Sequence, residues 1–411
     1  MSSDGAERPS LRKSLDIVPT EHEGEQVFAV RDPLGLATEP ILVPGEILFL
    51  MSLMDGGRTM ADLQIEFTKK FGQLIMEEKV SGIAAQLDER GFLDSARFRE
   101  KVAALEREFR SAEAREPSHA GQAYPGDADA LRALLGEILP LDGAEESSRS
   151  RRAVPRGVVA PHIDIERGRK IYGRAYAELA RTAPPHTAVL LGTAHFADGN
   201  IFVLTDRDFA TPLGTARADR AFCRTVADAY PADIRKGELA HRTEHSIEFQ
   251  ILFLQHLYGD RMPQIVPLLG TGFEAAGEEF NSPRDLAEVG GLLDGFGRAI
   301  EECPGDVLFV AGADLCHAGP RFGAPRPLSA DDLKRIESED RQALEAGAAK
   351  GADAFYEEVS RIGNRNNICS AVSLYTMLAL FEGRQVSLLD YDMALEADGQ
   401  AAVGFGAMRF D

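Results

Sequence analysis

Residues 158–168 read VVAPHIDIERG, a short apolar run that ends at a proline and is followed at once by a histidine. The opening VVA is β-branched and uniformly apolar, which is typical of a strand buried on both faces of a sheet. The histidine after it is either a hydrogen-bonded structural group or an imidazole directed at a metal from the strand end. Both interpretations depend on what the rest of the chain brings to the same place.

Similar apolar runs recur after residue 155, and segments with helical patterning alternate with them. The predicted strands are GVVAP (157–161), TAVLLG (187–192), QIVPLLG (264–270) and DVLFVAG (306–312). The predicted helices cover residues 166–182, 217–230, 244–258, 284–302, 330–348 and 368–382. Buried strands that alternate with helices predict an α/β fold with a parallel or mixed central sheet and helices on both faces.

The chain has 411 residues, more than one ordinary domain holds, so a second, smaller domain is expected. We expect a polar N-terminal segment at residues 1–30 and a solvated connecting helix at 96–117, because the latter is rich in Ala, Glu and Arg. The larger α/β domain is predicted to span residues 118–411. Within it, the polar segment 142–157 is expected to be an exposed loop that precedes the sheet.

The smaller domain is predicted at residues 31–95 as a winged-helix-like unit. Thr59 and Asp62 have the spacing of a helix N-cap with an acidic first turn, and Gly72 is placed to end that helix. Residues 31–94 hold six Lys or Arg against eleven Asp or Glu, so a protein or peptide docking role is favoured over DNA binding. In this pattern the unit resembles the PqqD-like domains, which recognise peptides.

Composition excludes several classes of protein. The net charge of −21 argues against a general nucleic-acid binder, and no apolar run approaches the roughly 20 residues of a membrane span. The first residues, MSSDGAERPSLRKS, lack the apolar stretch of a secretory signal, so a cytoplasmic location is expected. Aromatic content is 7% without tryptophan, so no obvious stacking platform for a ring substrate stands out in the sequence. Four cysteines form no CxxC pair, which argues against a disulfide framework: Cys223, Cys303, Cys316 and Cys369.

Polar side chains follow three of the predicted strands. His162 follows the first, His195 follows the second, and Asp314, Cys316 and His317 follow the last. Ligands of open α/β sheets bind outside the carboxyl ends of the strands, so these side chains should gather at one edge. Two imidazoles and a carboxylate with open positions are the arrangement that binds ferrous iron for oxygen chemistry.

Cys369 is a candidate thiolate for the same edge. It lies in NRNNICSAVSLYTML, where Asn366 or Asn367 could cap the following helix and leave the sulfur near the positive helix end, which lowers a thiol pKa. A thiolate favours softer metals such as copper(I) or zinc. The alternative is that Cys369 is a small buried apolar residue, as most free cysteines are.

A competing motif is HRTEH at residues 241–245, which fits the H-x-x-E-H pattern of inverted zinc peptidases. In that hypothesis His241 and His245 bind zinc and Glu244 is the base. However, apolar residues continue at helical spacing through the following segment, so the helix is expected to begin near Thr243. His241 would then precede the helix, and the two histidines would not share a face.

Seven motifs, taken in order, resemble those of the Memo family, called protein B of the AmmeMemoRadiSam system in bacteria. They cover about residues 118–411 and read SHAGQAYPGDADALRALL, APHID…RG..YG.AY, LLGTAHF, TPLGTA, EHSIEFQILFLQ, GADLCHAG and NICS. The family is similar in fold to the class III extradiol dioxygenases, so the resemblance implies that fold. It also implies an iron or copper ion held by His162, His195 and Cys369, with Asp314 on or beside the metal.

By likeness to the dioxygenases, the resemblance implies that His317 moves a proton at bound substrate, and that Glu244 and His245 line the same cleft. The family's PHAGY is PHIDI here, so Ile163 and Asp164 stand beside the first histidine, and the Arg and His that follow the family's cysteine are absent. The first hypothesis is therefore a metal-binding, dioxygenase-like oxidoreductase. The second is a non-catalytic docking partner of a radical SAM protein or peptide, and the third is the zinc peptidase.

Overall fold

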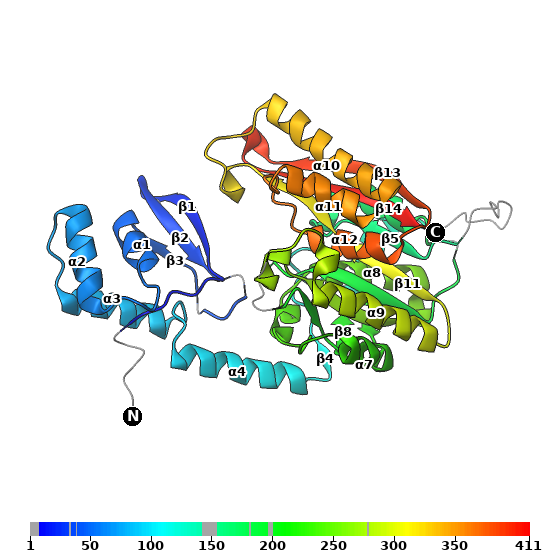
Figure 1. Ribbon diagram of the computed structural model, residues 1–411, viewed down its shortest axis with the longest axis horizontal. Coiled ribbons are helices and arrows are strands. Elements are labelled where there is room, and N and C mark those ends of the chain that lie inside the picture. The colour runs from blue at the N-terminus through cyan, green and yellow to red at the C-terminus, as the bar shows by residue number, and fades with distance from the viewer. Residues whose placement is uncertain are drawn as a thin grey trace. The chain divides into compact units, whose positions relative to one another are not determined.

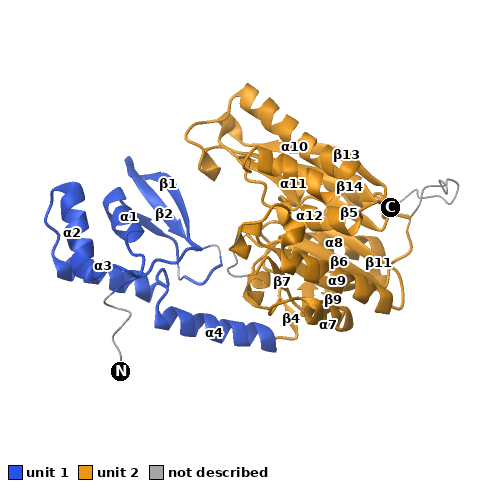
Figure 2. Ribbon diagram, in the orientation of Figure 1, with its two compact units in different colours: residues 1–111 blue, residues 112–411 orange. Residues whose placement is uncertain are grey.

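The computed structural model describes residues 8–32, 34–37, 39–141, 154–180, 182–195, 200–277 and 279–411. The chain divides into two compact units, residues 1–111 and 112–411, which are described separately (Figure 2). Most of the loop predicted at 142–157 lies outside the described residues. Among the helices that are described, none combines the length and apolar character needed to cross a membrane.

The first unit contains a three-stranded antiparallel sheet and helices that follow it. The strands, in sheet order, are β1 (Asp16–His22), β2 (Glu25–Arg31) and β3 (Ile41–Val43). The helices are α1 (Gly45–Ser52), α2 (Met60–Phe71), α3 (Glu77–Glu89) and α4 (Ala96–Ser111). Much of the predicted polar segment 1–30 is therefore a β-hairpin, whose turn uses the positive φ of Glu23 and Gly24.

Helix α2 begins and ends where the sequence predicts. The Thr59 side chain accepts a hydrogen bond from Asp62 N, the Asp62 side chain accepts one from Thr59 N, and Gly72 closes the helix at φ 67°. After α3, Leu93 forms an isolated antiparallel bridge with Leu11. The likeness to a winged helix stays a prediction.

The predicted connecting helix ends earlier than expected. Helix α4 stops at Ser111, and Ala114–Arg115 form a short strand, β4, that pairs in parallel with β8 (Asp208–Thr211). Strand β8 pairs on its other side with β9 (Gly214–Ala216). The reason lies in Arg115, which is 1% exposed and anchors this strand in the second unit.

An eight-stranded mixed sheet forms the centre of the second unit (Figure 1). Its order is β12-β14-β5-β11-β6-β10-β7, and β13 also pairs with β14. Strands β5, β11, β6 and β10 are parallel, whereas β7, β12, β13 and β14 pair antiparallel to their neighbours. The bounds are β5 (Gly157–Ala160), β6 (Thr187–Thr193), β7 (Phe202–Leu204), β10 (Gln264–Gly270), β11 (Val307–Gly312), β12 (Asp314–Ala318), β13 (Val386–Leu395) and β14 (Ala402–Phe410).

Helices cover both faces of this sheet. Successive residues of a strand point to opposite faces, so each strand contributes side chains to the core on either side. Val158 and Ala160 of β5 join the core with α5 (Ala128–Ile138), α6 (Ile165–Tyr176) and α8 (Ser246–Tyr258). Val159 joins the opposite core, formed with α7 (Arg220–Ala229), α9 (Ala287–Glu302), α10 (Ala330–Lys350), α11 (Ala352–Arg361) and α12 (Ala371–Leu380). The predicted α/β class with a mixed central sheet is confirmed.

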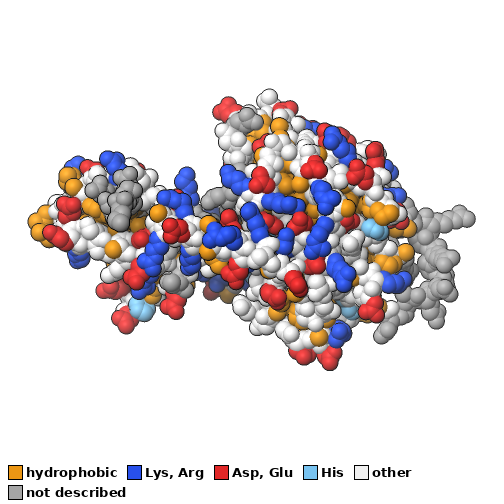
Figure 3. Space-filling model, turned by 90° about the horizontal axis from the view of Figure 1, so that it is seen from below, with side chains coloured by type: hydrophobic (Ala, Val, Ile, Leu, Met, Phe, Trp, Pro, Cys, Tyr) orange, Lys and Arg blue, Asp and Glu red, His pale blue; other side chains and the backbone are white. Residues whose placement is uncertain are grey.

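The predicted helices are all found, with shifted bounds. The largest differences are that the helix predicted at 166–182 ends at Tyr176, and that the one predicted at 284–302 begins as a 3₁₀ turn before α9. The described 3₁₀ segments are Glu238–Arg242, Gly259–Arg261, Phe273–Ala276, Pro283–Asp285, Pro320–Phe322 and Ala397–Gly399. On the face of the second unit seen in Figure 3, acidic and basic side chains are interspersed, so the net charge of −21 is not gathered there into one acidic field.

Candidate metal centre

The carboxyl ends of the parallel strands meet at one edge of the sheet. Register pairs Ala160 of β5 with Gly312 of β11, and Thr193 of β6 with Gly270 of β10. His162 follows β5 by two residues, His195 follows β6 by two, and Asp314 begins β12 directly after β11. The structure therefore brings together the polar side chains that the sequence placed after separate strands.

The start of α8 reaches the same edge and adds Glu244 and His245. It can approach because the strands carry glycine where they face it: a Cβ at Gly192 would lie 2.6 Å from Ser246 Oγ, and one at Gly312 would lie 2.5 Å from Ser246 O. Ser246 Oγ also accepts a hydrogen bond from Thr193 N at 3.0 Å and donates one to Thr193 O at 3.1 Å. These contacts fix the helix start against the end of β6.

The start of α12 brings Cys369 to the site. Ser370 Oγ accepts a hydrogen bond from Asp314 N at 3.1 Å and lies 2.8 Å from Thr193 Oγ1, which ties this turn to two strand ends. The predicted asparagine cap is wrong, because the N-cap residue is Ser370 and no side chain caps the helix. Asn367 Nδ2 instead donates to His317 O at 3.1 Å.

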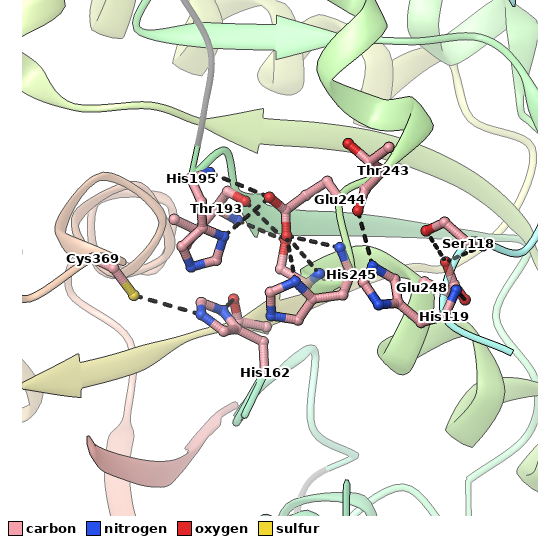
Figure 4. Close-up of polar contacts among 12 residues, drawn as sticks. Ser118, His119, His162, Thr193, His195, Thr243, Glu244, His245, Glu248 and Cys369 are labelled. Atoms are coloured by element: carbon pink, nitrogen blue, oxygen red, sulfur yellow. Dashed lines mark hydrogen bonds and ion pairs between the residues drawn. The ribbon is translucent and has the colours of Figure 1, made fainter. Parts of the chain in front are cut away.

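Each of three histidines has its Nδ1 atom occupied by an oxygen. His162 Nδ1 donates to Gly312 O at 2.9 Å, His195 Nδ1 donates to Glu244 Oε2 at 3.0 Å, and His245 Nδ1 faces Glu244 Oε1 at 3.1 Å (Figure 4). Since these oxygens only accept, each Nδ1 carries a proton, and Nε2 is the atom of each ring that can bind a metal once its own proton has been displaced. One ring nitrogen from each histidine lies within 4.8 Å of those of the other two.

Glu244 is the hub of this arrangement. Besides the two rings, its carboxylate accepts hydrogen bonds from the backbone N–H groups of His195 at 3.2 Å, His245 at 2.8 Å and Ser246 at 3.0 Å. Burial alone would raise its pKa, but the two imidazoles hold the pKa well below its usual value. The group is an ionised carboxylate that orients two imidazoles at once.

Cys369 and Asp314 flank His162. The Cys369 Sγ atom lies 3.5 Å from His162 Nε2, and Asp314 Oδ2 lies 3.7 Å from the same nitrogen. Burial opposes ionisation of the Cys369 thiol, yet the His317 and His162 imidazoles hold its pKa well below the usual value. Burial likewise opposes protonation of His162, but Asp314 and Cys369 raise its pKa to about 9. The cysteine is thus a thiolate rather than an inert apolar group.

His317 lies on β12 and also interacts with the Cys369 sulfur. Its Nδ1 donates to Leu315 O at 3.1 Å, and its ring meets Phe322 edge-on at 5.0 Å between centroids. Burial opposes protonation of His317, and the neighbouring Cys369 raises its pKa above the usual value. Its Nε2 atom is therefore the atom at which this side chain can hold or release a proton.

The donor set fits a transition-metal ion. In a tetrahedral site with typical Zn–S and Zn–N bond lengths, a sulfur and a nitrogen ligand lie roughly 3.6 Å apart. The observed separation of 3.5 Å between Cys369 Sγ and His162 Nε2 matches this value. Ligating histidines also typically donate their second ring N–H to a carboxylate or carbonyl, as these three do. The combination of imidazoles, a thiolate and a nearby carboxylate suits iron, copper or zinc.

A buried polar network beneath His245 was missed from the sequence. Glu248 is fully buried and accepts hydrogen bonds from Arg115, Tyr124 and the backbone N–H groups of Ser118 and His119. The His119 ring lies 5.4 Å from that of His245, with its Nε2 donating to Thr243 O at 2.9 Å. The SHAGQAYPGD motif was the available signal, because it contains most of these partners.

Two other sequence features have structural explanations. His241 is 1% exposed, its Nε2 donates to Val203 O at 3.0 Å, and burial lowers its pKa to about 4. It is absent from the histidine cluster found among the described residues, so its contacts do not support the peptidase hypothesis. Asp164, beside His162, is the N-cap of α6 and accepts hydrogen bonds from Glu166 N and Arg167 N.

Comparison with known proteins agrees with the motifs. A family model described as Memo-like protein matches residues 115–409. A MEMO1 family protein of Aquifex aeolicus is 30% identical over 386 residues, covering 93% of this chain and 96% of the relative. One from Thermus thermophilus is 28% identical and covers 86% and 99%, and one from Methanopyrus kandleri is 29% identical and covers 72% and 98%. The alignment to the Aquifex protein is longer than the second unit, so that similarity extends into the first. The chain therefore belongs to the Memo-like protein family.

Proposed function

We propose that this protein binds an iron or copper ion at the strand-end site and is an oxidoreductase related to the extradiol dioxygenases. One observation carries the proposal: ring nitrogens of His162, His195 and His245 lie within 4.8 Å of one another, beside the Cys369 thiolate. A buried ionised sulfur needs positive charge beside it, which the imidazoles supply in the metal-free protein and which a bound metal ion would supply in their place. A cytoplasmic location is part of the proposal.

The metal, when bound, would supply one-electron redox or oxygen chemistry that side chains lack. The chain's own residues have separate tasks. Glu244 orients His195 and His245, Gly312 O holds the third ring through His162 Nδ1 at 2.9 Å, and Asp314 Oδ1 accepts the backbone N–H of His162 at 2.9 Å. His317 Nε2 holds or releases a proton beside the thiolate, which makes it the candidate acid or base.

The test is metal content by elemental analysis after anaerobic purification. The wild type is expected to hold stoichiometric iron or copper, and His162→Ala, His195→Ala and Cys369→Ser should each lose it. His256→Ala and Cys303→Ser are matched controls, because these side chains have other partners: His256 Nε2 is bonded to Leu139 O, and Cys303 Sγ lies 3.7 Å from His186 Nδ1. A wild type without metal, or variants that keep it, would overturn the proposal. Oxygen uptake with a panel of ring substrates then tests the oxidoreductase part.

A second candidate function is docking through the first unit, either to a radical SAM protein or to a peptide. The observation that favours it is a group of exposed apolar side chains on α2 and the turn after it: Ile65 is 49% exposed, Leu74 74% and Met76 58%. Apolar exposure of this kind marks binding surfaces. In a pull-down with the full chain as bait, the wild type should bind a partner that the Leu74→Asp, Met76→Asp double variant does not bind. Equal binding of that partner by the two baits would count against docking.

A further inference from the structure

Two clefts in the second unit differ in what they could bind. The larger, about 700 Å³, includes Gln264 and Met262, so it lies at the amino-terminal end of β10, away from the strand-end site. The smaller, about 570 Å³, is lined by both His195 and Cys369. Only the second gives an occupant direct access to candidate metal ligands, so it is the cleft considered for substrate.

One wall of the smaller cleft is aromatic. Phe273, Phe280 and Tyr356 all line it, with ring centroids 5.5 Å apart for Phe273 and Tyr356 and 5.9 Å apart for Phe280 and Tyr356. Phe273 is buried, whereas Phe280 and Tyr356 are half-buried and so present ring surface to the cleft. These rings were not obvious from the low aromatic content of the sequence, because the fold gathers them from separate segments.

The charge of the lining selects against anions. Among the described residues that line this cleft there is no Lys or Arg, and Glu274 supplies a carboxylate. An acidic group placed beside Glu274 would therefore meet a like charge with no Lys or Arg in the lining to offset it, whereas an amine placed there would meet an opposite charge. Neutral polar groups, including those of Thr271 and Asn364, complete the wall.

We propose that this cleft binds a neutral or positively charged aromatic molecule, with its ring against Tyr356 and Phe280 and its metal-reactive end toward Cys369 and His195. The metal-reactive end rests on the proposed function, whereas the ring and charge preferences rest on the lining alone. The volume is that of a site for a small organic molecule. Acidic aromatics and phosphorylated compounds are disfavoured as substrates.

The experiment compares dopamine with 3,4-dihydroxyphenylacetate, which share a ring and both hydroxyls but carry opposite charges on the side chain. Calorimetric titration of metal-loaded protein should show dopamine binding about fivefold or more tightly, the size expected for one exposed charge. Glu274→Gln should reduce the ratio to about twofold, whereas Glu301→Gln, an exposed carboxylate on α9, should leave it unchanged. Equal binding of the two ligands, or a preference for the acid, would overturn the proposal.

The aromatic wall is tested separately. Tyr356→Ala should weaken binding of both ligands about tenfold, while Tyr356→Phe, which keeps the ring, should bind like the wild type. Unchanged affinity in Tyr356→Ala would refute the ring contact. Metal content is measured for every variant, and chelator-treated protein is titrated in parallel. If the wild type holds no metal the proposed function fails, but the charge preference of the metal-free protein still supports or refutes the cleft assignment.

Discussion

Glu244 Oε2 accepts two hydrogen bonds from a single residue, His195: one from the ring Nδ1 at 3.0 Å and one from the backbone N–H at 3.2 Å. The second oxygen, Oε1, contacts the backbone N–H and ring Nδ1 of His245 in the same way, at 2.8 and 3.1 Å. One buried carboxylate thus fixes the backbone, the ring angle and the tautomer of two candidate ligands. These contacts make Glu244 a positioning residue.

Replacing Glu244 by Gln tests this role. Glutamine has one acceptor oxygen, so its NH₂ group must face one of the two Nδ1 atoms, and that imidazole must move its proton to Nε2. Metal affinity, measured by competition with a chelator, is expected to fall about 10- to 100-fold. Glu301→Gln serves as control, since its side chain is exposed on α9. Wild-type affinity in Glu244→Gln would show that the carboxylate does not position the ligands.

His245 and His119 form a matched pair of imidazoles, with ring centroids 5.4 Å apart. His245 belongs to the cluster of converging nitrogens, whereas His119 Nε2 is already bonded to Thr243 O at 2.9 Å. We expect His245→Ala to weaken metal binding and His119→Ala to leave it close to wild type. A spectroscopic titration with Co²⁺ would read out both variants. The reverse ranking would remove His245 from the ligand set.

The ion pair of Arg115 with Glu248 is fully buried, with 0% exposure on both side chains. Arg115→Met is expected to lower the free energy of unfolding by about 3–5 kcal/mol, because it leaves a buried carboxylate without its cation. Arg132→Met breaks an exposed pair with Asp129 and should cost less than about 1 kcal/mol. Urea unfolding midpoints measure both, and similar losses in the two variants would contradict the prediction.

The burial of Asp340 predicts that the free energy of unfolding depends on pH. The carboxyl is fully buried and accepts hydrogen bonds from Cys316 N at 3.2 Å and Tyr391 OH at 2.9 Å. Burial raises its pKa to about 6 in the folded state. Because a raised pKa means that the folded state holds the proton more tightly, this stabilising contribution is full below about pH 4 and is lost as pH rises through about 6.

Asp340→Asn should remove that dependence. Relative to the variant, the wild type is expected to lose up to about 3 kcal/mol of unfolding free energy between pH 4 and 7. Urea titrations across this range measure the difference. Asp331→Asn, exposed on the same helix, should run parallel to the wild type. Parallel curves for the wild type and Asp340→Asn would show that folding does not raise the pKa of this carboxyl.

The strands and their ends could be predicted because burial on both faces leaves a local signature, an uninterrupted apolar run. That signature located β5, β6, β10 and β11, and with them the positions of His162, His195 and Asp314. The hairpin of β1 and β2 left a weaker signature, since DIVPTEH is mostly exposed and the apolar run of EQVFAVR is only four residues long, with Val30 alone fully buried. Strand pairing there depends on the turn and on the helices beneath it, which local composition does not report.

The coupling of Glu244 to His195 could not be predicted either. It depends on how closely the start of α8 approaches β6, which is set by the absence of side chains at Gly192 and Gly312. The H-x-x-E-H pattern pointed instead to His241, whose ring is committed to Val203 O. The asparagine cap failed for a similar reason, because tertiary partners compete for side chains that could cap a helix.

Strand β14 lies between β12 and β5, so the central sheet is incomplete without it. About 240 residues of chain separate β5 from β14, although the two strands pair directly. Pairing these two strands closes a very long loop. Because closing the loop costs conformational entropy, we expect the pairing to form late in folding. During synthesis, His162 and His195 leave the ribosome long before Cys369 and β14, the strand that completes the sheet. A nascent chain would carry an incomplete set of candidate ligands for most of its translation, so a metal bound at the proposed site is expected to enter after the sheet has closed.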